Sequence, residues 1–294
     1  MKKISLYKIA TGLGRRGLLK WLSDEKYIKL VYYAEFKKKL NLSNPQTYNE
    51  KLQWLKLHDR RDLYTIMVDK YAAKDYVSNI IGEKYIIPTI AVYDKFDDIN
   101  FDKLPNQFVI KCTLDSGSIV IVKDKSKLDI KTAKRKINKG LKNNGYNYGR
   151  EWPYKNVKPR IIIEKYMEDN DTKELRDYKF FCFYGEPKLM FLATDRQVGK
   201  TKFNFYDLNF QLLPFTQGHP NDIRSIKKPK MFDQMIELSK KISKEIPHVR
   251  VDFYEINGKV YFGELTFYHY SGFEKFVPEE WDKKLGDLIE LPKK

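Results

Sequence analysis

The alternation of apolar and polar residues divides the chain into a helix-rich first part and a β-rich remainder. Between about residues 16 and 40, apolar residues recur at helical spacing among lysines, which predicts an amphipathic basic helical region. Asn44-Pro45 then interrupts the pattern. Two further helices are predicted at residues 47–57, which begin with a capping sequence, and at residues 63–80, which Gly82 ends.

Beyond residue 85 the pattern changes to short β-rich runs. Residues 107–112 and 118–123 predict a hairpin with a Gly/Ser loop, and a lysine-rich helix is expected at residues 130–142. The run at residues 160–167 has the apolar character of a buried strand. The other predicted elements are strand pairs at 177–183 with 188–194 and 202–205 with 210–213, a helix at 229–246, a hairpin at 249–266 and a closing helix at 278–289.

Composition and charge exclude several classes of protein. The chain has 294 residues, of which 42% are hydrophobic, so it can bury a large core. No apolar run approaches the roughly 18–20 residues that span a bilayer. The two cysteines, Cys112 and Cys182, lie in strand-like runs and are expected to be core residues rather than a disulfide or a zinc site. The net charge of +17 attracts anionic partners, but the basic residues are dispersed, so we do not expect nucleic acid as a partner.

The N-terminal segment allows two interpretations of its contacts. Lys8 interrupts the first apolar stretch and Arg15-Arg16 replace a small-residue cleavage site, so we expect a cytoplasmic protein without a signal peptide. The basic helical region that follows either packs on the body with a solvated lysine face or contacts an anionic membrane peripherally.

The hairpin at residues 249–266 carries two acids within apolar strands. A three-residue loop at 257–259 pairs Ile256 with Val260 and brings Asp252 opposite Glu264, whereas a two-residue turn puts the acids on opposite faces. Like charges directly opposite on neighbouring strands need compensation, which a bound Mg²⁺ or a basic side chain such as Arg250 supplies.

Two other segments carry groups suited to a nucleotide. Lys111 ends an apolar strand just before a Gly/Ser loop that contains Ser116 and Gly117, an arrangement that offers an ammonium group and backbone N–H groups to phosphate oxygens. It is not a P-loop, because no Gly-Lys-Ser/Thr follows. Glu164 and Lys165 end the buried strand at a position where a hinge between two lobes can hold a purine.

The order of these segments resembles the ATP-grasp superfamily: a helical Lys70, the Lys111 strand with its loop, the Glu164 hinge and the acid hairpin. The chain more closely resembles the TupA-like branch, which is found with teichuronopeptide and other cell-surface polysaccharide synthesis. The closer likeness is carried by Asn49-Glu50-Lys51-Leu52-Gln53-Trp54-Leu55-Lys56, Asp69-Lys70-Tyr71-Ala72, residues 177–187, and Gly263-Glu264-Leu265-Thr266-Phe267-Tyr268.

The resemblance implies an α+β fold in which two α+β lobes hold ATP between them, behind an N-terminal helical extension. It divides the chain into an N-terminal basic helical region (1–60), a lobe with the phosphate-binding hairpin (61–160) and a lobe with the metal-binding hairpin (161–294). The resemblance implies phosphate contacts for Lys70, Lys111, Ser116 and Gly117, and adenine contacts for Glu164, Lys165 and Met167. It implies ribose contacts for Glu168 or Asp169, and Mg²⁺ ligation by Asp252, Glu264 and Thr266. Arg250 together with Lys111 is implied to stabilise the transferred phosphoryl group.

Two positions depart from the family pattern. Many members place Asn two residues after the metal-binding glutamate, and here Thr266 supplies a weaker neutral oxygen. Asp115 puts an acid beside the expected phosphates. Both departures keep open a non-catalytic adaptor on a degenerate nucleotide-binding fold.

The function implied by the resemblance is ATP- and Mg²⁺-dependent carboxylate–amine ligation through an acyl phosphate. The carboxylate belongs to an amino acid or to a uronic acid of a surface polysaccharide or its precursor. The rival enzyme is a nucleotide-sugar glycosyltransferase, in which Asp169-Asn170-Asp171 holds a metal and a diphosphate. His269 follows the acid hairpin and is expected to be structural, because a lone histidine is more often a hydrogen-bonded residue than a catalytic base.

Overall fold

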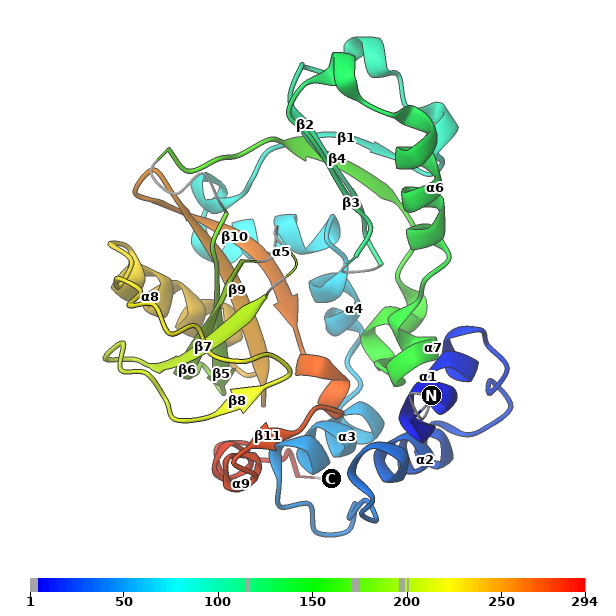
Figure 1. The fold of residues 1–294 in the computed structure, drawn as a ribbon, viewed down its shortest axis with the longest axis vertical. Helices are drawn as coiled ribbons and strands as arrows, with labels where there is room; N and C mark the ends of the chain where they lie inside the picture. Colours follow the sequence, from blue (N-terminus) through cyan, green and yellow to red (C-terminus); the bar gives the residue numbers. More distant parts are fainter. Residues whose placement is uncertain (1–4, 115–116, 171–174, 196–198, 200, 294) are drawn as a thin grey trace.

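Two antiparallel sheets with their helices form the body of the molecule (Figure 1). The computed structural model describes residues 5–114, 117–170, 175–195, 199 and 201–293. The four-stranded sheet has the order β1 (Thr89–Tyr93), β4 (Ile161–Lys165), β2 (Phe108–Cys112), β3 (Ile119–Val122). The five-stranded sheet has the order β10 (Lys259–Thr266), β9 (Val249–Ile256), β5 (Asp177–Phe183), β6 (Glu186–Thr194), β7 (Lys202–Asp207). A small third sheet pairs β11 (Phe276–Val277) with β8 (Thr216–Gln217).

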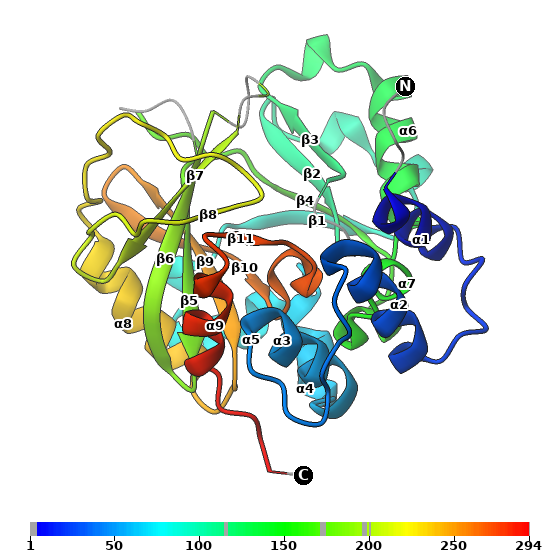
Figure 2. The same ribbon diagram turned by 60° about the horizontal axis from the view of Figure 1, so that its bottom comes forward.

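Helices cover both sheets and form an N-terminal cluster (Figures 1 and 2). The helices are α1 (Leu6–Arg15), α2 (Asp24–Phe36), α3 (Tyr48–His58), α4 (Asp62–Val68), α5 (Ala72–Ile81), α6 (Ile130–Leu141), α7 (Gly145–Gly149), α8 (Phe232–Ser243) and α9 (Glu280–Asp287). Helix α6 packs on β2 and β3, and α8 packs on β5, β6 and β9. Helices α1, α2 and α7 lie together beside α3. Within the described residues, none of these helices combines the length and the apolar content needed to cross a membrane.

Two apolar cores correspond to the two sheets. The larger core packs Phe180, Phe181 and Phe253 of the five-stranded sheet against α8 and the helices α3 to α5. The smaller core lies between the four-stranded sheet and α6 and includes Ile110 and Ile163. Cys112 and Cys182 are buried free thiols in these cores, as the sequence predicts.

The prediction of a single helix at residues 63–80 is wrong. It is two helices, α4 and α5, that are separated at Asp69, whose backbone is extended (ψ 112°). The Asp69 carboxylate accepts a hydrogen bond from the Tyr71 backbone N–H at 2.9 Å and so caps the second helix. This break places Lys70 between two helices rather than on a helix face. In contrast, α3 begins as predicted, with a capping box between Thr47 and Glu50.

The prediction of one basic helical region at residues 16–40 is also wrong. Helix α1 ends before Gly17, whose φ of 75° suits glycine, and α2 starts at the capping residue Ser23. Helix α2 directs Tyr27, Ile28 and Val31 into the interior. Its apolar face is therefore covered by the protein.

Strand prediction failed at two edges of the sheets. The expected strand at residues 210–213 is only a single bridge between Tyr206 and Leu212. Strand β1 was not expected, although it pairs with β4 over residues 89–93. The boundary expected between the two lobes lies after residue 160. Strand β4 begins directly after that boundary, but it belongs to the same sheet as β2 and β3.

Candidate functional site

A cavity of about 540 Å³ lies between the two sheets. The lining residues that carry charge are Lys111, Lys123, Glu164, Lys165, Glu168, Asp177 and Asp195. Apolar walls come from Ile119 and Ile121 on one side and from Leu175 and Ala193 on the other. An apolar slot with a few charged groups is the typical form of a small-molecule site.

The four-stranded sheet supplies a buried carboxylate held between two lysines. Glu164 Oε2 lies 2.6 Å from Lys111 Nζ, and Glu164 Oε1 pairs with Lys74. Lys74 also donates to the Ile87 carbonyl and the Thr89 hydroxyl, each at 2.8 Å, so its ammonium group is fully engaged. Burial alone would raise the pKa of Glu164, but the two lysines hold this pKa below its ordinary value. The cluster carries one excess positive charge.

Lys111 is the lysine of this cluster that lines the cavity, together with Glu164. Burial would lower the pKa of Lys111, yet the Glu164 carboxylate, with Glu264 and Asp177 farther away, holds this pKa above its ordinary value. Lys111 is therefore a firmly charged ammonium group on a rigid strand at the mouth of an apolar slot.

The hinge after β4 forms one end of the cavity. Lys165, Tyr166, Met167 and Glu168 all line it. The Lys165 backbone N–H donates to the Pro88 carbonyl at 3.0 Å, which fixes the hinge. Of the two acids proposed for the ribose, Glu168 lines the cavity and pairs with Lys123 at 3.0 Å.

Asp169 has a different position from Glu168. Its Oδ2 accepts a hydrogen bond from the Asn257 backbone N–H at 2.9 Å, and so it ties the hinge to the β9–β10 turn. Asp171, the third residue of the Asp-x-Asp sequence, lies outside the described residues. Ser116 of the phosphate loop lies outside them as well, and Gly117 is exposed at the start of the segment that leads into β3.

The acid hairpin pairs Asp252 with Glu264. Of the two turns that the sequence allows, the structure has the two-residue turn Asn257-Gly258, across which Ile256 pairs with Lys259. Asn257 and Gly258 both have positive φ values, 51° and 72°, as a type I′ turn requires. A β-bulge between Phe262 and Glu264 then shifts the register by one residue and brings Glu264 opposite Asp252.

Basic side chains compensate both acids of the hairpin. Arg250 contacts Asp252 through two bonds, Nε to Oδ1 at 2.7 Å and Nη2 to Oδ2 at 2.8 Å. Lys179 on β5, directly opposite Asp252, pairs with the same carboxylate. Glu264 has longer contacts, 3.4 Å to Lys70 Nζ and 3.4 Å to Arg250 Nη2. Burial would raise the pKa of Glu264, but Lys70, Lys179 and Arg250 hold this pKa well below its ordinary value.

His269 is buried behind this network. Arg250 Nη1 lies 2.8 Å from His269 Nδ1. Because the guanidinium group only donates, His269 Nδ1 must accept, and the imidazole is neutral. Burial, with Arg250 beside it, lowers the pKa of His269 well below its ordinary value. His269 therefore orients Arg250, which agrees with the structural role expected from the sequence.

Comparison with protein families identifies the chain. A sequence model described as the TupA-like ATP-grasp family matches residues 50–290. The chain belongs to this family. The fold is therefore the ATP-grasp fold, as the order of the lysine, hinge and acid-hairpin segments predicts. The comparison with curated proteins found no match.

Solved ATP-grasp structures are similar at low identity. D-alanine-D-alanine ligase from Helicobacter pylori shares 15% identity at a TM-score of 0.47, over 85% of this chain and 68% of that chain. The same enzyme from Bacillus anthracis complexed with ATP shares 16% at 0.39, over 77% and 68%. L-amino acid ligase from Bacillus licheniformis shares 12% at 0.45, over 86% and 57%.

The acid hairpin offers oxygen donors of the type that Mg²⁺ prefers, but it does not hold them ready as a set. Among the described residues, no three His, Cys, Asp or Glu side chains gather at a point where they could ligate a metal. The Glu264 side chain is 30% exposed and has no contact shorter than 3.4 Å to a cation, so it fits a ligand role directly. The Asp252 side chain is 1% exposed, and both of its oxygens are hydrogen-bonded to Arg250. Asp252 can therefore ligate a metal ion only when the ion takes the place of a basic side chain. Thr266 is half-buried on the same strand, opposite Arg250.

Sequence reasoning missed three charged residues of the site. Lys74 of α5 is the second lysine that pairs with Glu164, and no local signal in the sequence marks it. Lys179 and Asp177 lie on β5 beside β9, with Lys179 opposite Asp252. Both fall within a segment that carries the family likeness, but only strand pairing brings them to the acid hairpin.

Polar residues of α3 belong to another segment that carries the family likeness, residues 49–56, and they contact the loop after the acid hairpin. Gln53 Nε2 donates to the carbonyls of Ser271 and Gly272, at 3.1 and 2.7 Å. Lys56, which is completely buried, contacts the Ser271 carbonyl at 2.7 Å and the Gly149 carbonyl at 2.8 Å. Ser271 has a φ of 56°, an uncommon value for a non-glycine residue. Helix α3 thus fixes the backbone of the loop that follows the acid hairpin.

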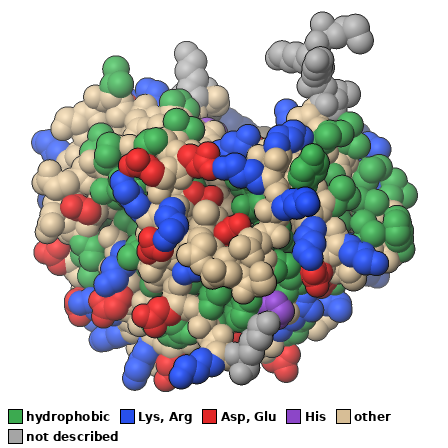
Figure 3. Space-filling view, turned by 90° about the horizontal axis from the view of Figure 1, so that it is seen from below, with side chains coloured by type: hydrophobic (Ala, Val, Ile, Leu, Met, Phe, Trp, Pro, Cys, Tyr) green, Lys and Arg blue, Asp and Glu red, His purple; other side chains and the backbone are tan. Residues whose placement is uncertain are grey.

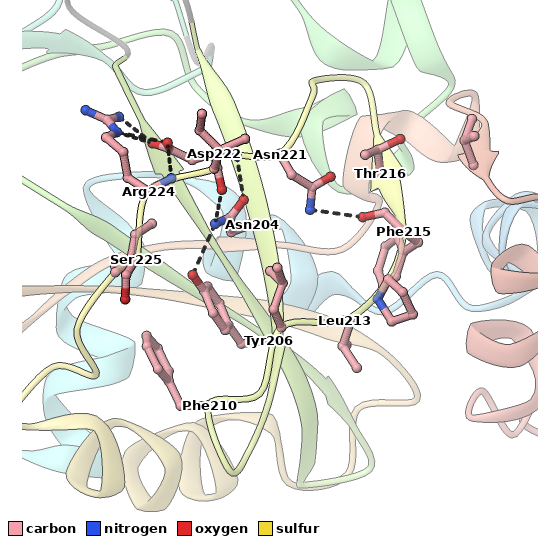
Figure 4. Close-up of a pocket in the computed structure, with 15 residues that line it drawn as sticks. Asn204, Tyr206, Phe210, Leu213, Phe215, Thr216, Asn221, Asp222, Arg224 and Ser225 are labelled. Atoms are coloured by element: carbon pink, nitrogen blue, oxygen red, sulfur yellow. Dashed lines mark hydrogen bonds and ion pairs between the residues drawn. The ribbon is translucent and has the colours of Figure 1, made fainter.

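A second cavity, of about 680 Å³, lies beside β7 and β8 (Figure 4). The described residues that line it include none of the predicted site residues. Its polar groups are paired with one another: Asn204 Nδ2 donates to Tyr206 Oη at 3.1 Å, and Arg224 Nε donates to Asp222 at 2.8 Å. Tyr206 also stacks on Phe210. Of the charged residues predicted for the site, Lys111, Glu164, Lys165 and Glu168 line the cavity between the two sheets instead.

Proposed function

We propose that this protein is an ATP- and Mg²⁺-dependent carboxylate–amine ligase that acts through an acyl phosphate. The observation that carries the proposal is the cavity between the sheets of an ATP-grasp chain, with Lys111 and the 165–168 hinge along it and the acid hairpin beside it. Phosphoryl transfer depends mainly on positioning and charge neutralisation, so this chemistry requires no nucleophilic triad.

The proposal assigns ATP to the cavity between the sheets. Adenine lies against the 165–167 hinge, with Glu164 behind it, and Glu168 meets the ribose. Lys111 and Lys70 neutralise the phosphates, and the loop with Ser116 and Gly117 closes over them. These assignments are supported by the lining of the cavity for Lys111, Lys165, Met167 and Glu168.

Mg²⁺ is assigned to Glu264, with Asp252 and Thr266 as further oxygen donors. Bound ATP with Mg²⁺ supplies the phosphoryl group that activates the substrate carboxylate. Arg250 is held by Asp252 and His269 with its Nη2 toward Glu264, and from there it stabilises charge on the phosphoryl group in transfer.

The substrate class is the finer part of the proposal. We assign the carboxylate to an amino acid or to a uronic acid of a cell-surface polysaccharide or its precursor, and the product is an amide. The net charge of +17 favours such an acidic acceptor. ATP is a cytoplasmic substrate, so the proposal places the enzyme in the cytoplasm.

The test is calorimetry of the purified protein with ATP, ADP and UDP-sugars, each with and without Mg²⁺, followed by trapping with hydroxylamine. Hydroxylamine converts an acyl phosphate into a hydroxamate, so uronates and amino acids can be screened without knowledge of the amine. Hydroxamate that requires ATP, Mg²⁺ and a carboxylate supports the ligase. A response to UDP-sugars without one to ATP indicates a glycosyltransferase instead. Binding of neither indicates a non-catalytic adaptor.

A further inference from the structure

The N-terminal segment presents apolar side chains to solvent. Leu6 is 58% exposed, Leu18 58% and Trp21 78%. Ile9 is also exposed. These four residues, named here the N-terminal apolar surface, belong to α1 and to the connection between α1 and α2. Isolated exposed apolar residues are common, whereas adjacent ones mark an interaction surface.

Backbone geometry makes the surface continuous. Leu6, Ile9 and Leu13 follow one another at helical spacing along one stripe of α1. The helix ends in a Schellman motif, in which the Leu18 N–H donates to the Leu13 carbonyl at 3.0 Å and the Gly17 N–H to the Gly14 carbonyl at 2.8 Å. This motif brings the residue after the glycine back onto the last turn of the helix. Leu18 therefore extends the stripe, and Trp21 lies three residues farther along the connection to α2.

The segment is anchored to the body, while its outer side remains uncovered. Tyr7 Oη lies 2.9 Å from Tyr148 Oη, and Tyr27 Oη donates to the Tyr148 carbonyl at 2.8 Å. The Arg150 guanidinium donates to the Leu19 carbonyl at 2.8 Å. Because α1 and the connection are fixed by these contacts, the exposed side chains form a defined surface.

Positive charge surrounds this surface. Residues 5–30 contain six Lys or Arg against two Asp or Glu. Both acids are engaged, Asp24 by Arg60 at 2.7 Å and Glu25 by Lys29. Lys8, Arg16 and Lys20 are exposed. Figure 3 shows hydrophobic side chains gathered on the side of the molecule where the N-terminal helices lie, with Lys and Arg side chains among them.

We propose that the N-terminal apolar surface docks on an anionic lipid membrane, with Leu18 and Trp21 inserted at the interface and Lys8, Arg16 and Lys20 near the lipid headgroups. Tryptophan and aliphatic side chains with flanking lysines and arginines are the composition that binds at membrane interfaces. The proposal concerns α1 and the connection after it; on α2, Tyr27, Ile28 and Val31 are buried, and the exposed Leu30 and Tyr33 are not part of the surface defined here. It is independent of the ligase proposal.

The test is co-sedimentation of the full chain with vesicles of pure phosphatidylcholine and with vesicles that contain phosphatidylglycerol. We expect binding to the anionic vesicles alone, and a loss of at least about tenfold with the double variant Leu18→Ser/Trp21→Ser. Ile223→Ser is the matched control, since Ile223 is 97% exposed beside β7 and β8 and should leave binding unchanged. Thermal unfolding of each variant reports whether the fold is intact.

Charge is tested separately. Lys20→Glu should weaken binding to the anionic vesicles, whereas Lys227→Glu, an exposed change outside this segment, should weaken it less. Equal binding to both vesicle types, no binding, or full binding by the double variant would overturn the proposal. So would a dimer in solution that the double variant converts to a monomer while vesicles stay unbound, because the surface would then contact a second copy.

Discussion

The two charged clusters of the cleft differ in how completely they are balanced. On the four-stranded sheet, Lys74 and Lys111 share the single carboxylate of Glu164. At the five-stranded sheet, Arg250 and Lys179 of the sheet and Lys70 of the α4–α5 connection face Asp177, Asp252 and Glu264, so charges of the two signs are equal in number. The first cluster has charge left for a phosphate. In the second, Glu264 is open to a metal ion, but Asp252 becomes a ligand only when a basic side chain is displaced from it.

This contrast explains why two acids opposite each other on a hairpin are tolerated in the absence of a metal ion. Like charges in that position destabilise a sheet unless they are compensated. Here the compensation comes from a neighbouring strand, through Lys179, and from Arg250 two residues earlier on β9. The network holds the pKa of Glu264 below its ordinary value and so keeps this carboxylate ionised.

The largest effect is expected from Asp252→Asn. It leaves Arg250 and Lys179 in the interior without their shared carboxylate, and removal of one partner of a buried ion pair costs about 3–5 kcal/mol. The free energy of unfolding measured in urea should fall by this amount. Glu264→Gln is the control, since its contacts are longer and its side chain is partly exposed, and it should cost no more than about 1 kcal/mol.

The double variant Asp252→Asn/Lys179→Met refines this prediction. It removes one positive charge together with the negative one, so part of the lost stability should return. If the single variant unfolds at the same urea concentration as the native chain, the balance described for the five-stranded sheet is wrong.

Lys111→Met should weaken ATP binding by about ten- to hundredfold. A hydrogen bond to a charged group contributes about 1.5–3 kcal/mol, and Lys111 is the cation of the first cluster that lines the cavity. Calorimetry with ATP and Mg²⁺ measures the change. The control is Lys123→Met, whose side chain is 59% exposed at the rim and pairs with Glu168. An equal loss in both variants would show that the effect is general charge rather than a phosphate contact.

Glu264→Gln should remove most of the Mg²⁺ dependence of nucleotide binding while the protein stays folded. The measurement is ATP affinity over a range of Mg²⁺ concentrations, compared with the native chain. Mg²⁺-dependent binding that survives in both Glu264→Gln and Asp252→Asn would refute the assignment of the metal to the acid hairpin.

The smallest effect is a pH dependence that both clusters share. The pKa of Glu164 and that of Glu264 are lowered in the folded protein. The folded state therefore binds fewer protons than the unfolded state, and the stabilisation is complete above the unfolded pKa of about 4.3. It is lost as the pH falls toward the folded values. Urea unfolding from pH 6 to pH 3 should show declining stability, with a shallower decline in Glu164→Gln; an unchanged slope would contradict the prediction.

Much of the candidate site could be predicted from the sequence, because its residues occur next to strong local signals. Lys111 ends an apolar β-rich run, Glu164 ends another, and Asp252 and Glu264 lie on either side of an Asn-Gly turn. The type of each element follows from the spacing of apolar residues and from turn residues, which are local properties. The family likeness added the order in which these pieces occur.

Other features depended on contacts between distant segments. Lys74 meets Glu164 only when α5 packs beside the four-stranded sheet, and Lys179 meets Asp252 only when β5 pairs with β9. Neither partner can be read from the local pattern, because a lysine in a helix or strand is most often solvated.

The sequence by itself predicted most of the candidate site residues and the kinds of element on which they lie. The tertiary structure decided how those residues face one another. The acid hairpin shows the reason: its Asn-Gly turn alone puts Asp252 and Glu264 on opposite faces, and the bulge before Glu264 brings them together. A one-residue change of register reverses the face of every later side chain, and the packing of the whole sheet selects the register.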